Sequence, residues 1–337
     1  MTIIYAILIF CVLIFVHEFG HFAAAKLCGV KVNEFSIGMG PAFFQRQRGE
    51  TQYSLRILPI GGYCAMEGED EDSEDERAFN NKPAWQRAIV LAAGAFMNLV
   101  TAVVLLIIIA FWAGQATTVM DEITDDSPAY EAGMQAGDQI TAVDGQKTDS
   151  WSDITSVIGS KKNEAVQVTV LRDGSELTMS VMTEYDKTEK RAKIGIKPHV
   201  EHNLGTSVTS GIKNTGKMAV TMYDVLKQLV TGKVSIKELS GPVGIVYVVN
   251  DTAKAGVIYV VYLSALLSLN LAIMNMLPLP ALDGGRLLFL LIRKITGDHM
   301  TDEMEGKVHF IGIVLLLMLM VVVTWNDIIK FIVPLFS

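Results

Sequence analysis

Charge and cysteine are both scarce in this chain of 337 residues. Only 19% of the residues are charged, half are hydrophobic and the mean hydropathy is +0.37, which argues against a disordered chain and against an ordinary soluble enzyme. No segment is basic enough to indicate nucleic-acid binding, so we expect no nucleic-acid partner. The three cysteines are odd in number and lie in or near apolar runs, so they predict neither a disulfide framework nor a cysteine metal site.

Acidic residues are unevenly distributed. Much of the formal net charge of −8 comes from one run, Glu67–Glu76, which predicts a solvated loop in preference to a binding patch. A polar middle section, roughly residues 115–205, separates two hydrophobic thirds. This distribution predicts a soluble domain inserted between membrane segments.

Four long apolar segments meet or approach the ~20 residues that a membrane-spanning helix needs. They are Ile3–Leu27, Ala88–Ala113, Gly256–Leu277 and Val308–Thr324. The first lacks the basic start and the cleavage site of a signal peptide, so we interpret it as a membrane helix. Lys and Arg concentrate in the loops after the first and third segments, which predicts that both loops are cytoplasmic and that residues 115–255 and both termini lie outside. We expect a multi-pass protein of the cell inner (plasma) membrane, with the lipid bilayer as a partner.

The polar section has the pattern of a small mixed α/β domain. Strands are predicted at Gln139–Val143, Val166–Leu171, Leu177–Met182 and Ile194–Ile196, a helix near Ser152–Ile158, and turns at Asp144-Gly145 and Asp173-Gly174. Within it, Ser127–Gly145 (SPAYEAGMQAGDQITAVDG) resembles the signature of PDZ domains. The resemblance implies a groove that takes peptide termini by strand addition, and a compact spacer with an idle groove is the alternative.

Two further segments show amphipathic patterns. Between the first two membrane segments, Glu50–Met66 alternates apolar side chains and then reaches a glycine pair, which predicts a membrane-associated β-hairpin. Its exposed edge could hold a substrate in extended form, or it could be a structural lid. After the insert, apolar residues from Met218 to Leu229 recur at helical spacing with lysines nearby. They predict an interfacial amphipathic helix, with packing onto the insert as the alternative.

The sequence His17-Glu18-Phe19-Gly20-His21 is an H-E-x-x-H motif. On a helix the two histidines lie on one face with Cβ atoms ~5–6 Å apart, so both imidazoles can bind one Zn²⁺. Glu18 points away from the ligand set but lies close enough to act on a metal-bound water. Chance packing would leave three ionisable groups unpaired in an apolar helix, at a cost of several kcal/mol, so we expect a functional site.

A catalytic zinc takes a third protein ligand and keeps one position open. The segment Asn275–Gly284 (NMLPLPALDG) offers Asp283 at the cytoplasmic end of the third membrane segment, on the same side as His21. Pro278 and Pro280 break the helix there, and irregular backbone at membrane depth is tolerated only where it lines a protein cavity.

Together, H-E-x-x-H, N-x-x-P-x-P-x-L-D-G and the intervening PDZ signature resemble the site-2 proteases, zinc metalloproteases that cut within the membrane. The closest resemblance is to the bacterial regulator of sigma-E protease group in its single-PDZ form. It implies that His17, His21 and Asp283 hold zinc, that Glu18 is the general base and that Asn275 helps to hold the substrate. The family's usual substrates are single-pass membrane proteins, namely anti-sigma factors and signal-peptide remnants.

The resemblance also covers Gly94–Asn98 (GAFMN), which matches the family's G-x-x-x-N element and implies that the second membrane helix packs close to the first. The spacing of small residues supports this packing, and a simple helix–helix contact is the alternative role for Asn98. Some relatives have two PDZ domains. The presence of only one here puts in doubt any gating scheme that needs a tandem pair.

The expected architecture is a multi-pass α-helical membrane protein with about four transmembrane helices, a membrane-associated β-hairpin and one inserted α/β PDZ domain. Residues 1–114 and 256–337 form the two parts of the membrane core, 115–200 the extracytoplasmic PDZ domain, and 201–255 a linker with the amphipathic helix. The competing functions are a zinc-binding transporter and a catalytically idle PDZ scaffold. A transporter is expected to show internal repeats, which are not found, and a scaffold would not need Glu18 between the histidines.

Overall fold

The computed structural model describes residues 2–69, 71, 73–235, 238–296 and 302–335. It divides into two compact units, one formed by Met1–Ile109 with Gly211–Ser337 and the other by Ala110–Ser210. Each unit has its own core, and each is described separately below. We call the first the membrane unit and the second the insert.

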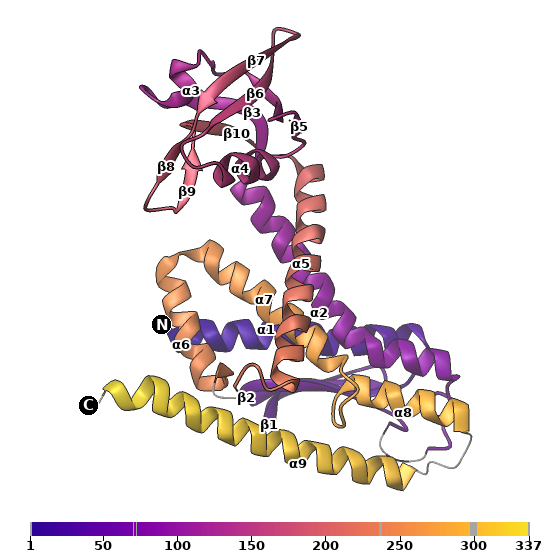
Figure 1. Ribbon diagram of the computed structural model, residues 1–337. Helices are drawn as coiled ribbons and strands as arrows, with labels where there is room; N and C mark the ends of the chain where they lie inside the picture. Colours follow the sequence, from indigo (N-terminus) through magenta and orange to yellow (C-terminus); the bar gives the residue numbers. More distant parts are fainter. Residues whose placement is uncertain (1, 70, 72, 236–237, 297–301, 336–337) are drawn as a thin grey trace. The chain divides into compact units, whose positions relative to one another are not determined.

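Four helices of the described chain are long and apolar enough to span a membrane, as predicted (Figure 1). They are α1 (Thr2–Leu27), α2 (Ala84–Ala113), α7 (Val257–Asn275) and α9 (Asp302–Asp327), which continues into η2 (Ile328–Ile332) and η3 (Val333–Leu335). The fourth span, Met304–Ile332, is longer than predicted because its helix includes charged residues at the start and passes Trp325 at the end. The sequence did not predict α6 (Pro242–Ala255) or α8 (Asp283–Thr296).

The predicted hairpin is a larger sheet made of two long antiparallel strands, β1 (Val32–Arg48) and β2 (Thr51–Met66). Each strand folds back on itself, since Glu34 pairs with both Gln52 and Ala65. Gly38 and Gly61, with φ of 86° and 85°, lie where the two strands bend. The second strand lies where the sequence indicated, but β1 was missed because glycines and a proline interrupt its alternation.

The sheet packs between membrane helices. Apolar side chains from α1, both strands, α2, α8 and two connecting loops form one buried cluster: Ala24, Ala25, Val30, Val32, Phe35, Cys64, Met66, Phe79, Val90, Leu91 and Leu290. A second cluster joins α1 to α6 and α7 through Leu13, Val249 and Leu263. None of Cys11, Cys28 and Cys64 forms a disulfide in the described chain.

One sequence prediction for the membrane unit is wrong and another is confirmed. The predicted amphipathic helix is the C-terminal part of α5 (Leu204–Val230), but its apolar face packs against Ala102 of α2 and Leu269 of α7, so it is not interfacial. The acidic run is a loop whose described residues are exposed or half-buried, as predicted, and Glu67 and Asp75 both pair with Lys31. A periodic pattern identifies an apolar or charged face but not the partner that covers it.

The insert is a mixed α/β domain whose main sheet has the strand order β10-β3-β4-β6-β7, with β5 beside β4. The elements are β3 (Gln115–Ile123), α3 (Pro128–Glu131), β4 (Gln139–Val143), β5 (Gln146–Lys147), α4 (Trp151–Ser160), β6 (Ala165–Arg172), β7 (Ser175–Met182), β8 (Glu184–Asp186), β9 (Arg191–Lys193) and β10 (Ile196–Glu201). Three of the four predicted strands and the helix are in place. The strand predicted at Ile194–Ile196 is wrong, because the chain bends at Gly195 (φ 81°) between β9 and β10.

Candidate metal centre

The first membrane helix crosses the second at very short range. A Cβ atom on Gly20 of α1 would lie 2.4 Å from the carbonyl oxygen of Ala93, and a Cβ on Gly94 of α2 would lie 2.2 Å from His21 Nε2. No side chain fits at either position without displacing its neighbours. The two glycines therefore allow the H-E-x-x-H segment to lie directly against α2.

Three potential ligand atoms converge at this crossing. Nε2 of His17 lies 3.2 Å from Nε2 of His21, and Oδ2 of Asp283 lies 3.3 Å and 3.4 Å from these two nitrogens. Zinc bonds of ~2.0–2.1 Å in tetrahedral geometry separate ligand atoms by about 3.3 Å, so this triangle has the dimensions of one face of a zinc site. Asp283 Oδ2 is buried and accepts no hydrogen bond from any described residue, as expected for an atom whose partner is a metal.

Neighbouring groups orient both imidazoles. His21 Nδ1 lies 2.8 Å from the carbonyl oxygen of Val90, which can only accept, so Nδ1 carries the proton and the Nε2 lone pair faces the triangle. The buried Asn98 amide lies 3.3 Å from His17 Nδ1. Rotating that amide by half a turn brings Oδ1, which has no partner among the described residues, to accept a proton from Nδ1. The same tautomer then applies to both histidines.

Asp283, the third member of the triangle, is presented by a tightly folded loop. α7 ends at Asn275, the loop contains Pro278 and Pro280, and α8 begins at Asp283. Cβ atoms on the next two residues would lie 2.4 Å and 2.1 Å from carbonyl oxygens of this loop, so only glycines let it fold back onto the first turn of α8.

The remaining predicted residues lie around the triangle. The Asn275 amide nitrogen is 3.5 Å from His17 Nε2. The Cγ atom of Glu18 faces β2, where a Cβ on Gly62 would lie 3.3 Å from it. Sequence reasoning missed Gly20, Val90 and the whole of β1. Of these, only Gly20 carried a signal, since it is a small residue inside the H-E-x-x-H motif.

Comparisons with known proteins identify the family of this chain. Residues 5–319 match Peptidase family M50. A putative zinc metalloprotease of Clostridium acetobutylicum is 42% identical over 330 residues, which covers 97% of each chain. The regulator of sigma-W protease RasP of Bacillus subtilis is 33% identical over 413 aligned positions, covering 97% of this chain and 98% of that protein.

The insert also resembles solved domains. The PDZ domain of an SdrC-like protein from Listeria innocua is 30% identical and covers 26% of this chain and 99% of that chain, with a TM-score of 0.23. The architecture is that of a multi-pass membrane protein with an inserted mixed α/β domain, as the sequence predicted. The family match extends over nearly the whole chain and the relatives are zinc metalloproteases. The chain therefore belongs to Peptidase family M50, the site-2 proteases, and is an intramembrane zinc metalloprotease.

Proposed function

We propose that this protease hydrolyses peptide bonds in or near the transmembrane segments of single-pass membrane proteins, with zinc held by His17, His21 and Asp283. The observation that carries the proposal is the triangle of ligand atoms, with sides of 3.2, 3.3 and 3.4 Å. Zinc bound there supplies a Lewis acid and lowers the pKa of its water toward neutrality. The relative RasP is named for regulating sigma-W, so we propose anti-sigma factors and signal-peptide remnants as the substrate classes.

Glu18 is the proposed general base. It follows a ligand directly in sequence, so its carboxylate can take a proton from the attacking water and later deliver one to the leaving amine. A Cβ atom on Gly62 of β2 would lie 3.3 Å from Glu18 Cγ, so the side chain of the proposed base lies against the sheet.

The proposed roles of the two asparagines and of Gly94 differ. Asn275 lies near the triangle without being one of its three corners, so its amide can donate to a substrate carbonyl. Asn98 fixes the tautomer of His17, and Ser268 fixes Asn98 in turn by donating to its backbone oxygen at 2.8 Å. Gly94 provides the space for His21.

The sheet is suited to holding an extended substrate. A helical substrate hides its carbonyls in its own hydrogen bonds, so it must unwind locally before it is cut. The Gly61–Met66 half of β2 pairs with β1 on one side and has no strand partner on the other among the described residues. An apolar cavity of about 300 Å³ between α1 and the sheet, lined in part by Phe15, Phe19 and Phe44, can take apolar side chains. These features favour strand addition over a purely structural lid.

The site assignment is tested with two variants measured side by side. Glu18→Gln should keep stoichiometric zinc but lose cleavage of a transmembrane model substrate by ~100-fold or more, because the amide cannot act as a base. Asp283→Ala should lose zinc and cleavage together. Zinc content is measured in detergent at matched protein yield. Zinc loss in Glu18→Gln, or zinc retained in Asp283→Ala, would contradict these roles.

The membrane orientation is a separate proposal. We place the predicted PDZ domain within the insert (residues 115–200) outside the cell, with residues 201–255 leading back to the membrane, and the metal centre toward the cytoplasmic side. The insert then meets only the outer parts of substrates and, through its PDZ groove, binds peptide termini left by an earlier cut.

Thiol labelling tests this orientation. Single cysteines at Ser175 and Ser73, in a variant lacking the three native cysteines, are exposed to a membrane-impermeant reagent in intact cells. Labelling at 175 and not at 73 is expected. The reverse pattern would invert the proposed orientation.

A further inference from the structure

The loop that presents Asp283 contains a residue in a costly conformation. Ala281 has φ of 73°, in the left-handed region that residues with a Cβ atom seldom occupy. It lies two residues before Asp283 and directly after Pro280. Such a conformation persists only when surrounding contacts hold it, so the environment of Ala281 shows what fixes this loop.

The contact that holds Ala281 comes from the fourth membrane helix. The Ala281 N–H donates to Nδ1 of His309 on α9 at 2.8 Å. Because a backbone N–H can only donate, Nδ1 is an acceptor and the proton of the imidazole is on Nε2. That edge of the ring lies 3.7 Å from Glu305, which favours this tautomer.

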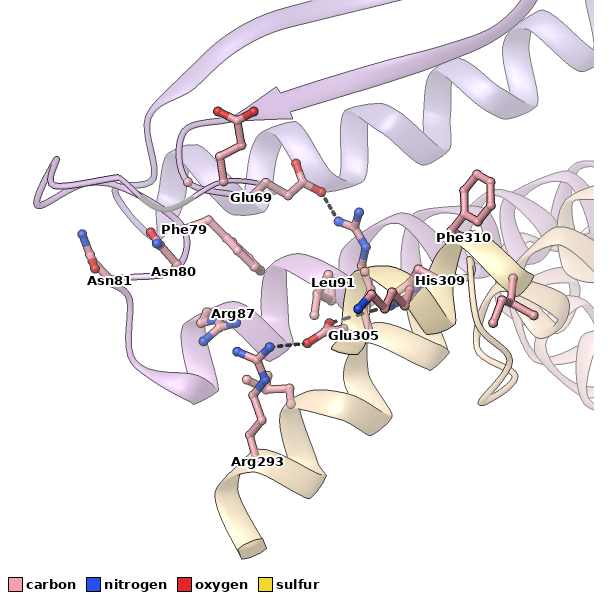
Figure 2. A pocket seen from close by; sticks show the side chains of 17 residues that line it. Glu69, Phe79, Asn80, Asn81, Arg87, Leu91, Arg293, Glu305, His309 and Phe310 are labelled. Carbon is pink, nitrogen blue, oxygen red and sulfur yellow. Dashed lines mark hydrogen bonds and ion pairs between the residues drawn. The ribbon is translucent and has the colours of Figure 1, made fainter. Parts of the chain in front are cut away.

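The rest of the ring is also fixed. Its centroid lies 5.3 Å from that of Phe289 on α8, and Glu305 is held by Arg293 at 2.7 Å. Figure 2 shows His309, Glu305 and Arg293 along the wall of a cavity of about 1060 Å³ formed by α2, α8, α9 and the segment around Asn80. His309 therefore lines this cavity and also contacts the loop through Nδ1.

In the described part of the chain, α9 is the least buried of the four spans. Only 11% of its apolar window is buried, against 28–33% in the other three spans. Near the loop, Gly312 touches Pro280 so closely that a Cβ atom would lie 2.4 Å from the proline ring. At the far end, Asp327 accepts the Gly244 N–H of α6 at 2.7 Å. Among the described residues, the contact of α9 with the Asp283 loop therefore depends on a short stretch that includes His309.

We propose that His309 is a positioning residue for the metal centre: by accepting the Ala281 N–H, it holds the loop in the conformation that directs Asp283 toward His17 and His21. The inference rests on the proposed ligand role of Asp283. It assigns α9 a part in building the site although none of its described residues belongs to the ligand triangle. Removal of the acceptor leaves the loop free to relax and displaces the carboxylate.

The test compares two substitutions that differ in the acceptor. His309→Asn keeps an oxygen at the place of Nδ1, whereas His309→Phe keeps a ring without an acceptor. Loss of an outer contact to a ligand typically costs about 10–100-fold in metal affinity. We expect a loss of this size in the zinc affinity of His309→Phe, measured by zinc release to a competing chelator, together with a lower kcat. In His309→Asn both quantities should change by less than about threefold. The exposed neighbour serves as the control, and Phe310→Leu should match the unmodified protein.

A second substitution keeps the test decisive if the ring variant is poorly folded. Glycine adopts positive φ without strain, so Ala281→Gly should restore part of the zinc affinity in the His309→Phe background. Equal losses in His309→Asn and His309→Phe, or no rescue by Ala281→Gly, would overturn the proposal. His17→Ala separates this proposal from the proposed ligand set. If His17→Ala retains zinc, the ligand set is wrong. If His17→Ala loses zinc and His309→Phe retains it, only the role of His309 fails.

Discussion

The insert and the membrane unit differ in where they place polar and apolar side chains. In the insert, Ile140 and Val170 are fully buried and the surface is polar, as in any domain surrounded by water. In the membrane unit, Phe96 and Phe310 are 60% and 67% exposed, while Asn98 and Ser268 are fully buried. Lipid does not penalise apolar surface, so the membrane unit is held by close backbone approach and buried polar contacts. The same substitution should therefore have different consequences in the two units.

The largest effect is expected at the helix crossing. In Gly94→Ala the new methyl would need to lie 2.2 Å from His21 Nε2, so the helices or the imidazole must move. A displacement near 1 Å at a catalytic site costs about 100-fold in rate. We expect at least that loss of cleavage, together with weaker zinc binding in chelator competition. Normal zinc affinity in this variant would show that the crossing can widen without cost.

The next largest effect is expected in the core of the insert. Ile140→Ala removes a buried side chain and leaves a cavity, which should lower the free energy of opening of the insert by about 2–5 kcal/mol. Hydrogen exchange of peptides from β6 in the full-length protein measures this change. Zinc content should stay at the unmodified level, because the insert has its own core. A parallel loss of zinc would show that the two units are energetically coupled.

A smaller effect depends on pH. Burial raises the pKa of the Asp138 carboxyl, but the Arg172 guanidinium, which donates at 2.6 Å and 2.7 Å, and the Gln135 N–H hold that pKa below its ordinary value. The stabilisation is thus fully present above the unfolded-state pKa of about 3.9 and is lost as pH falls through the folded-state value. Exchange of β4 and β6 peptides, corrected for intrinsic rates, should show constant stability from pH 7 to 5 and a decline below 4.

The control for this pH effect is a pair of amide substitutions. Asp138→Asn should be less stable at pH 7 and should show a shallower decline in acid. The exposed Asp125→Asn should keep the slope of the unmodified protein. Equal slopes in all three proteins would mean that the Asp138–Arg172 pair does not contribute to the acid sensitivity of the insert.

The smallest effect is expected from the same type of substitution as the largest, glycine to alanine, at a different position. Gly159 lies within α4 of the insert, and a Cβ atom there would have its nearest neighbour at 3.9 Å. Gly159→Ala should therefore stabilise the insert by about 0.4–1 kcal/mol, through loss of unfolded-state entropy. Slower exchange in α4 would confirm it. Destabilisation would weaken the contrast between a glycine required by packing and one that is not.

The features that could be predicted from the sequence are those that depend on residues close together in the chain. Apolar windows located the four spans, and the i, i+4 spacing placed His17 and His21 on one helix face, because both signals are local. Asp283 was accessible only through its motif and the expected sidedness of the chain. Its geometry depends on a loop folding over the two glycines that follow it, and on His309 from another helix.

Contacts across long sequence separations explain the rest. The first half of β1 pairs with β2 along both of its edges, which no rule of side-chain alternation anticipates. The apolar stripe of α5 was visible, but its partners on α2 and α7 were not, since a stripe does not identify what covers it. Val90 gave no signal at all, because any residue offers the same carbonyl to His21.

The crossing of α1 and α2 also limits how water reaches the metal. Every bond cut consumes one water molecule, yet the seam between Gly20 and Gly94 is too narrow for even a methyl group. Water therefore does not pass between the two helices at this crossing, and the seam closes one side of the proposed metal centre. If a substrate strand lies along β2, as proposed, it covers a further side, and the water that each turnover consumes must then be in place when the substrate binds.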